Sequence, residues 1–170
     1  MKHGDIEFFT ATCLKWQNLL NDIKHKEIIL DSLAFLVHEQ RIWLYGYVIM
    51  PNHLHIIWRK QDNWIEKNVQ QQFLKFTAQQ IKFNLLDTNP SHLMNYKSTQ
   101  FDRKFHFWER RPFKARNYTR EIIEQKLDYI HFNPVKAGLC IFPEDYLFSS
   151  APFYYQKSKN PILTHYMDHL

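Results

Sequence analysis

The feature that most constrains this chain is an apolar run from Tyr47 to Trp58 that contains two histidines one residue apart, His53 and His55. Because successive side chains of a β-strand point to opposite faces, both imidazoles would project from the same face of one strand. The run is apolar on both sides, which predicts a position near the centre of a sheet. Unpaired imidazoles would carry a desolvation cost there, so we expect their nitrogens to be used.

Two interpretations of this histidine pair are open. Side chains that share a strand face can hold one divalent metal ion between their ring nitrogens. The same spacing also fits a solvated strand face or two hydrogen-bonded core histidines, so spacing alone does not decide. Pro51 has no N–H to donate to a sheet ladder, and we therefore expect residues 51–52 to form the entry or a bulge just before the pair.

Composition indicates a globular protein and excludes several classes. The chain has 170 residues, 45% of them hydrophobic and 16% aromatic, which predicts a buried core and a single domain over residues 1–170. Its longest apolar segments are too short for a membrane span, and its first residues lack the apolar centre of a signal peptide. We therefore expect a cytoplasmic protein without a membrane partner. Cys13 and Cys140 lie far apart, which favours reduced thiols over a disulfide or a zinc site.

Hydrophobic periodicity predicts the element order β-α-β-β-α-β-α. This order favours an α+β fold in which helices pack on one face of an antiparallel sheet. Strands are expected at 6–14, 42–49 and 53–59, and short strands at 105–108 and 113–116. Helices are expected at 24–40 and 65–86 and after Thr119, with a loop at 87–100.

Positive charge concentrates in residues 97–116, where cations alternate with aromatic side chains. The whole chain has 22 Lys and Arg against 17 Asp and Glu, a net charge of +5. The pattern of this segment suits phosphate contacts and base stacking. It fits equally well an antiparallel strand pair with one basic solvated face. Trp108 is a candidate either for base stacking or for the core. The candidate phosphate contacts are Arg103, Lys104, Arg110, Arg111, Lys114 and Arg116.

The third predicted helix carries a tyrosine at the edge of its buried stripe. Thr119 is the expected N-cap, and Asn133-Pro134 the expected end. At about 100° per residue, Lys126, Tyr129 and Asn133 form a strip beside the stripe, which makes Tyr129 a candidate nucleophile. Taken alone, Tyr129 fits better a structural aromatic whose hydroxyl meets water or backbone. The buried stripe consists of Ile123, Leu127 and Ile130.

Two long motifs change this balance when they are considered together. They are Met50 to His55 and Tyr129 to Leu139, the second followed by Asp145 to Ser150. In this order and at this separation they closely resemble the REP-associated tyrosine transposases, which belong to the wider IS200-like single-tyrosine HUH transposase group. The likeness runs from about Ile6 to Phe153, and the two motifs together are far more specific than either alone.

The resemblance implies a ferredoxin-like sheet with His53 and His55 as the HUH pair on a central strand. A C-terminal helix across the sheet would present Tyr129 to a bound Mg²⁺ or Mn²⁺, and the third metal ligand would fall on Asn133. Some relatives have a glutamine there. The implied activity is that of a DNA strand transferase, which cleaves and rejoins single-stranded DNA through a 5′-phosphotyrosine bond. We expect Mn²⁺ to bind more tightly than Mg²⁺, because imidazole ligands suit it better.

The implied partner is single-stranded DNA with hairpins formed by REP-like palindromes, in the nucleoid of a bacterial cytoplasm. Lys126 and Lys136 are further candidate phosphate contacts, whereas His131 is expected to be structural. Both a monomer and a homodimer remain open. Two other functions are also open: a noncatalytic single-stranded nucleic-acid-binding module, and a metal-dependent phosphodiesterase that uses an activated water.

Overall fold

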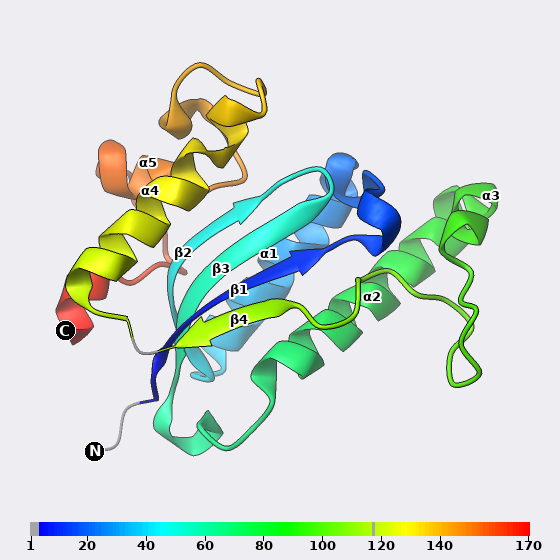
Figure 1. Ribbon diagram of the computed structural model, residues 1–170, viewed down its shortest axis with the longest axis horizontal. Helices are drawn as coiled ribbons and strands as arrows, with labels where there is room; N and C mark the ends of the chain where they lie inside the picture. Colours follow the sequence, from blue (N-terminus) through cyan, green and yellow to red (C-terminus); the bar gives the residue numbers. More distant parts are fainter. Residues whose placement is uncertain (1–3, 117) are drawn as a thin grey trace.

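The computed structural model describes residues 4–116 and 118–170 and is built around a four-stranded antiparallel sheet (Figure 1). The strands lie in the order β2-β3-β1-β4. With helices α1 and α2 as the crossovers, this is the ferredoxin-like arrangement, and it confirms the expected α+β class. The elements are β1 (Ile6–Thr12), α1 (Ile23–His38), β2 (Ile42–Ile49), β3 (His53–Lys60), α2 (Val69–Thr88) and β4 (Phe113–Arg116).

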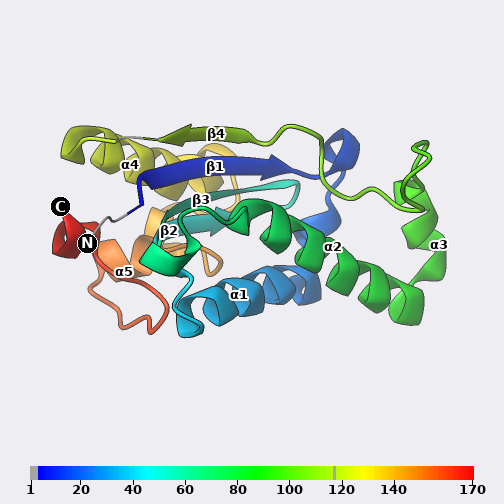
Figure 2. The same ribbon diagram turned by 90° about the horizontal axis from the view of Figure 1, so that it is seen from below.

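Helices cover both faces of the sheet. Helices α1 and α2 run side by side on one face (Figure 2), where Phe9, Ile56 and Trp58 are buried in the larger core. Helix α4 (Arg120–Lys136) covers the other face, where Phe8 and Ile57 belong to a second core. The expectation of helices on one face therefore holds for α1 and α2 only. Because β2 and β3 are apolar on both sides, their second face also needs a cover, and α4 provides it.

A glycine in β2 allows α4 to approach the sheet closely. The register of β2 against β3 shifts between Leu44 and Gly46, and Gly46 then faces the helix. A Cβ atom at Gly46 would lie 2.7 Å from Cδ2 of Leu127 and 3.3 Å from Cδ1 of Ile130. These two buried residues of α4 thus fill the space that a side chain would occupy.

The two ends of α4 differ in how well the sequence predicts them. Thr119 is the N-cap as expected, since its hydroxyl accepts a hydrogen bond from the N–H of Ile122 at 3.4 Å. The expected end at Asn133-Pro134 is wrong, because the helix continues to Lys136 with Pro134 buried inside it. The bias against a helical residue before proline is only steric, and here burial of the ring outweighs it. Asn133 therefore stays helical, one turn after Tyr129.

The segment between α2 and β4 also differs from expectation. Residues 105–108 do not form a strand. They make isolated bridges from Phe105 to Lys97 and from Trp108 to Cys13. Phe107 and Trp108 are adjacent and both buried, which the alternating geometry of a half-exposed strand does not allow. Trp108 is thus a core residue. Further helical turns are α3 (Pro90–Leu93), Met94–Tyr96 and, near the C-terminus, α5 (Ala151–Tyr155).

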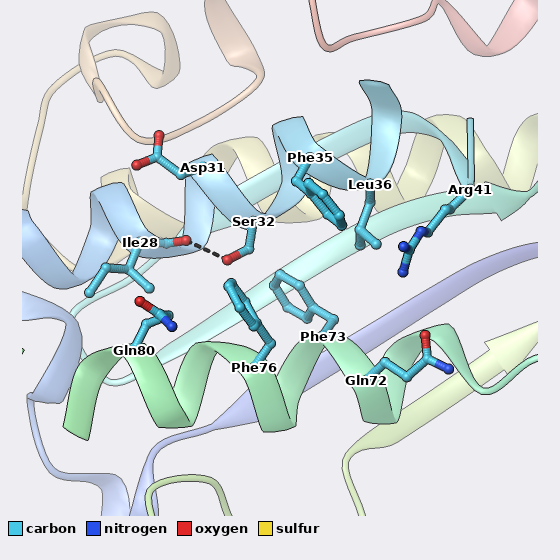
Figure 3. A pocket seen from close by; sticks show the side chains of 10 residues that line it. All are labelled: Ile28, Asp31, Ser32, Phe35, Leu36, Arg41, Gln72, Phe73, Phe76 and Gln80. Carbon is cyan, nitrogen blue, oxygen red and sulfur yellow. Dashed lines mark hydrogen bonds between the residues drawn. The ribbon is translucent and has the colours of Figure 1, made fainter. Parts of the chain in front are cut away.

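An apolar pocket of about 500 Å³ lies between α1 and α2 (Figure 3). The side chains of Phe35, Leu36, Phe73 and Phe76 line it. This pocket lies on the side of the sheet that α1 and α2 cover, whereas the histidine pair lies on the other side. No helix in the described part of the chain is long and apolar enough to cross a membrane.

Candidate functional site

The two histidines of β3 lie on the sheet face that α4 covers. Their ring centroids are 4.8 Å apart with the planes at 77°, which confirms that the rings share one face. In the neighbouring strand β1, Thr12 lies opposite His53 and Thr10 lies opposite His55. His55 also stacks on Phe8 at 5.6 Å. The pair thus sits on a central strand, as expected.

Hydrogen bonds orient both imidazoles in the same way. Nδ1 of His53 lies 2.7 Å from Oδ1 of Asn52, which can only accept, so Nδ1 carries the proton and Nε2 keeps a free lone pair. Nδ1 of His55 lies 2.7 Å from the hydroxyl of Thr10. Nε2 of His55 faces the amide of Asn133, whose Nδ2 is 3.4 Å away. Both histidines therefore present Nε2 as an acceptor.

Burial keeps these histidines uncharged. Only 4% of His55 is exposed. Burial lowers the pKa of His55 to about 3, and the positive charges of a protonated His53 and of Lys126 act in the same direction. Burial also lowers the pKa of His53. At neutral pH both rings are neutral, which is the form that binds metal ions.

Tyr129 lies over this pair from helix α4. Its ring meets the ring of His55 edge to face, with centroids 5.3 Å apart. The neighbouring helix residue Ile130 is fully buried, whereas 47% of Tyr129 is exposed. Nζ of Lys126, one turn earlier, lies 6.0 Å from the centroid of the Tyr129 ring. Packing thus holds the helix while Tyr129 remains accessible to a substrate.

A buried histidine and serine hold α4 against β2. Nε2 of His131 lies 2.8 Å from the hydroxyl of Ser150, which also accepts a hydrogen bond from the N–H of Tyr47 at 3.0 Å. Burial lowers the pKa of His131 to about 4. His131 therefore has a structural role, as expected, and it fixes the position of the helix that carries Tyr129.

Two other tyrosines near the second core are poorer nucleophiles. The hydroxyl of Tyr146 donates to the carbonyl of Ile49 at 2.6 Å, and burial raises its pKa to about 12. Burial also raises the pKa of Tyr118. Both hydroxyls thus resist ionisation, and Tyr129 is the better candidate.

Two of the six basic candidates in 97–116 are engaged elsewhere. The carboxylate of Glu7 is buried, accepts a hydrogen bond from Nε1 of Trp58 at 2.9 Å and pairs with Nζ of Lys114 at 3.1 Å. It also pairs with Nε of Arg116 at 3.4 Å. Glu7 alternates with Phe8 along β1, so these ion pairs lie on the face opposite His55. The charges of Lys114 and Arg116 already neutralise a buried carboxylate, so both are weaker candidates for DNA contacts than the sequence indicates.

The other basic candidates are exposed. Arg110 and Arg111 follow Glu109, whose N–H donates to the carbonyl of Thr12 at 2.7 Å, next to His53 in the sheet register. They therefore lie beside the histidine end of the sheet. Arg110 also donates to the side chain of Gln100. Further out, Arg103 pairs with Asp102 at 3.2 Å, and Lys104 lies over the ring of Phe105 at 5.7 Å. Lys136 is exposed in the last turn of α4.

The donor set fits a divalent metal ion. Among residues 4–116 and 118–170, no group of three or more His, Cys, Asp or Glu could hold one. A third protein ligand would therefore be of another type. The amide of Asn133 is the nearest candidate, and because its Nδ2 faces Nε2 of His55 at 3.4 Å, the amide would have to turn for its oxygen to bind an ion. The outer nitrogens of both histidines are hydrogen-bonded, to Asn52 and Thr10, as is usual for metal-binding imidazoles.

Sequence reasoning missed the residues that support the histidines. Thr10 contacts His55 only because β1 pairs with β3, and that register is a long-range property. Asn52 precedes His53 directly, and an amide next to a candidate metal-binding histidine is a signal that could have been used. Phe8, which stacks on His55, carries no signal of its own in the sequence.

Comparison with known proteins gives the fold a precedent. No protein-family model matches the chain, and no curated protein matches its sequence. A solved structure of a REP-associated tyrosine transposase bound to a REP hairpin is similar, with a TM-score of 0.66 and 18% sequence identity. The match covers 95% of this chain and 85% of that one. The chain has the fold of that transposase. At this identity the likeness concerns the fold alone, and it agrees with the resemblance seen in the two motifs.

A second solved structure is a candidate transposase from Deinococcus radiodurans R1. It matches with a TM-score of 0.42 and 16% identity, over 76% of this chain and 95% of that chain. This similarity is too weak to support an argument about the site.

Proposed function

We propose that this chain is a metal-dependent transesterase that cleaves and rejoins single-stranded DNA next to palindromic hairpins, with Tyr129 as its nucleophile. The observation that carries the proposal is the contact between Tyr129 and His55, with ring centroids 5.3 Å apart in one chain. A half-exposed tyrosine beside two neutral histidines and an amide is the set of groups that phosphodiester transfer needs. A site formed within one chain requires no partner subunit.

His53 and His55 would hold the metal ion through Nε2, and Asn133 through its amide oxygen. Bound Mg²⁺ or Mn²⁺ supplies a Lewis acid that polarises and orients the phosphate. We expect Mn²⁺ to bind more tightly, because imidazole ligands favour it. Thr10 and Asn52 hold Nδ1 of the two rings, which would leave the Nε2 lone pair of each histidine free for the ion.

Tyr129 performs the transfer itself. Its phenolic oxygen attacks phosphorus, the bond from phosphorus to the 3′-oxygen breaks, and that oxygen leaves with a proton as a free 3′-hydroxyl. Lys126 lies one turn before Tyr129 and provides a positive charge for the phenolate and the phosphate. The 5′-phosphotyrosine bond retains the energy of the diester. A second 3′-hydroxyl can therefore reverse the step and rejoin the strand without ATP.

The substrate class is supported by the fold and by charge. The similar transposase is described as bound to a REP hairpin. Here exposed Arg110 and Arg111 lie beside the histidine end of the sheet, where phosphates of a single strand next to a hairpin would lie. An unpaired strand can pass between a sheet and a helix more easily than a duplex can. We place the protein with bacterial DNA in the cytoplasm.

The test is to incubate the protein with end-labelled DNA that carries a REP-like hairpin and single-stranded flanks, in Mn²⁺, and to run a denaturing gel. We expect a covalent adduct for the wild type and none for Tyr129→Phe, which keeps the ring contact. Tyr155→Phe is the matched control, because Tyr155 is also half exposed but lies on α5. Cleavage without an adduct would favour the phosphodiesterase, and unchanged DNA the noncatalytic module.

A further inference from the structure

A turn after β1 exposes a tryptophan beside the histidine pair. Trp16 is 61% exposed, and its ring meets the ring of His53 edge to face with centroids 5.9 Å apart. Single exposed apolar side chains are common on protein surfaces, and Trp16 is informative because it borders the histidine pair. The position of Trp16 therefore points to a ligand that covers it.

The backbone of this turn is strained and firmly held. Lys15 and Trp16 have φ values of 53° and 56°, so two successive residues that are not glycine adopt the left-handed conformation. Such a conformation persists only where the surroundings enforce it, and it is concentrated at functional sites. Here the N–H of Lys15 donates to Oε1 of Glu109 at 2.6 Å. The N–H of Leu14 donates to the carbonyl of Phe107 at 2.7 Å.

Trp16 and His53 share one support. The N–H of Cys13 donates to the carbonyl of Asn52 at 2.9 Å, and the N–H of Leu20 donates to the carbonyl of Pro51 at 2.9 Å. The side chain of the same Asn52 holds Nδ1 of His53. Backbone hydrogen bonds on both sides of the turn thus fix the chain that carries Trp16 relative to the histidine strand.

We infer that Trp16 is a stacking site for an unpaired nucleobase, that of the nucleotide next to the phosphate bound at the histidines. This inference rests on the proposed function, because that function puts the phosphate there. A base is attached to the sugar beside its phosphate, so a phosphate near His53 brings a neighbouring base within reach of the indole. Stacking on an aromatic side chain requires a base with a free face, which selects a single strand over a continuous duplex. Exposed Lys15 adds a charge for the next phosphate.

The test measures the affinity for a fluorescein-labelled single-stranded oligonucleotide with Mn²⁺ and with chelator. Loss of one base stack predicts about 5- to 160-fold weaker binding for Trp16→Ala. Trp16→Phe keeps a stacking ring and should stay within a few-fold of wild type. The control is Phe83→Ala, which removes an aromatic side chain of 49% exposure from α2. This control should bind as the wild type does.

Abasic nucleotides, introduced at one position after another, separate stacking from an indirect effect through His53. In the wild type, one abasic position should weaken binding as much as Trp16→Ala does, and in Trp16→Ala that same position should have no further effect. Mn²⁺ affinity of Trp16→Ala without DNA should equal that of the wild type. The inference is overturned if Trp16→Ala binds DNA as tightly as the wild type does. It is also overturned if the substitution lowers the affinity by the same factor for every abasic oligonucleotide in the series. If the wild type still forms the covalent adduct in either of these cases, the proposed function stands and only the stacking inference fails.

Discussion

Tyr129 meets His55 edge to face at 5.3 Å within a single chain. The contact exists because β3 is a central strand, while α4 crosses the opposite face from α1 and α2. The histidine pair and the candidate nucleophile therefore belong to the same subunit, and the proposed site is complete without exchange of a helix between subunits.

A mixing experiment tests this arrangement. His55→Ala protein lacks one of the two proposed metal ligands, and Tyr129→Phe protein lacks the proposed nucleophile, so each alone should form no adduct with hairpin DNA in Mn²⁺. Because the site is formed in one chain, a mixture of the two variants should also form none, as judged on a denaturing gel. Adduct in the mixture at a substantial fraction of wild-type yield would mean that the tyrosine of one chain serves the histidines of another.

Thr10 provides a prediction that the sequence alone could not. Its hydroxyl lies 2.7 Å from Nδ1 of His55, on the side of the ring away from Asn133. Loss of such an outer contact usually weakens metal binding about 10- to 100-fold. Thr10→Val keeps the shape and should produce this loss in Mn²⁺ titrations monitored by electron paramagnetic resonance.

Thr12→Val is the matched control for that measurement. Thr12 is on the same strand and the same face, opposite His53, whose Nδ1 is already bound by Asn52. We expect its Mn²⁺ affinity to stay near that of the wild type. Equal losses in both variants would show that the strand as a whole is disturbed, and equal retention in both would exclude Thr10 as a support of His55.

Much of this architecture can be predicted from local patterns. The alternation around His53 and His55 fixes their shared strand face, because side-chain direction in a strand has period two. The helical strip of Lys126, Tyr129 and Asn133 follows in the same way from 3.6 residues per turn. Such local geometry survives folding where the segment is long and strongly patterned.

The parts that the sequence did not predict depend on long-range pairing or on competing energies. The sequence predicts Lys114 and Arg116 as surface cations, but the strand register brings both to the buried carboxylate of Glu7. Pro134 predicts the end of a helix, but the helix continues through it with the proline ring buried. In each case the local pattern is correct as a tendency, and a tertiary contact decides the outcome.

His131 makes stability depend on pH. Its pKa is about 4 in the folded protein, below the reference value of about 6.5 for an unfolded chain. Between these pH values the unfolded state binds more protons, so stability should fall as the pH drops from about 6.5 to about 4. The contribution is at most about 3 kcal/mol. Urea unfolding in chelator at pH 7.5 and 4.5 measures it.

The control for this titration is His131→Gln, which can still hydrogen-bond to Ser150 but does not titrate. Its stability should fall less between pH 7.5 and 4.5 than that of the wild type. His55, with a folded pKa of about 3, contributes a fall of the same sign in both proteins. Parallel pH profiles for the two proteins would therefore contradict the assignment to His131.

The basic residues of 97–116 should separate into two groups. Arg110→Ala and Arg111→Ala should each weaken single-strand binding and reduce the slope of log affinity against log salt by about 0.7, the value for one phosphate contact.

Lys114→Met should leave this salt slope unchanged but lower the free energy of unfolding by roughly 1–2 kcal/mol, because Glu7 loses a partner. Exposed Lys75, on α2 at the opposite face, is the control, and Lys75→Ala should change neither quantity. A reduced slope for Lys114→Met would mean that Lys114 leaves Glu7 to bind DNA, and the path of the strand would then extend over β4.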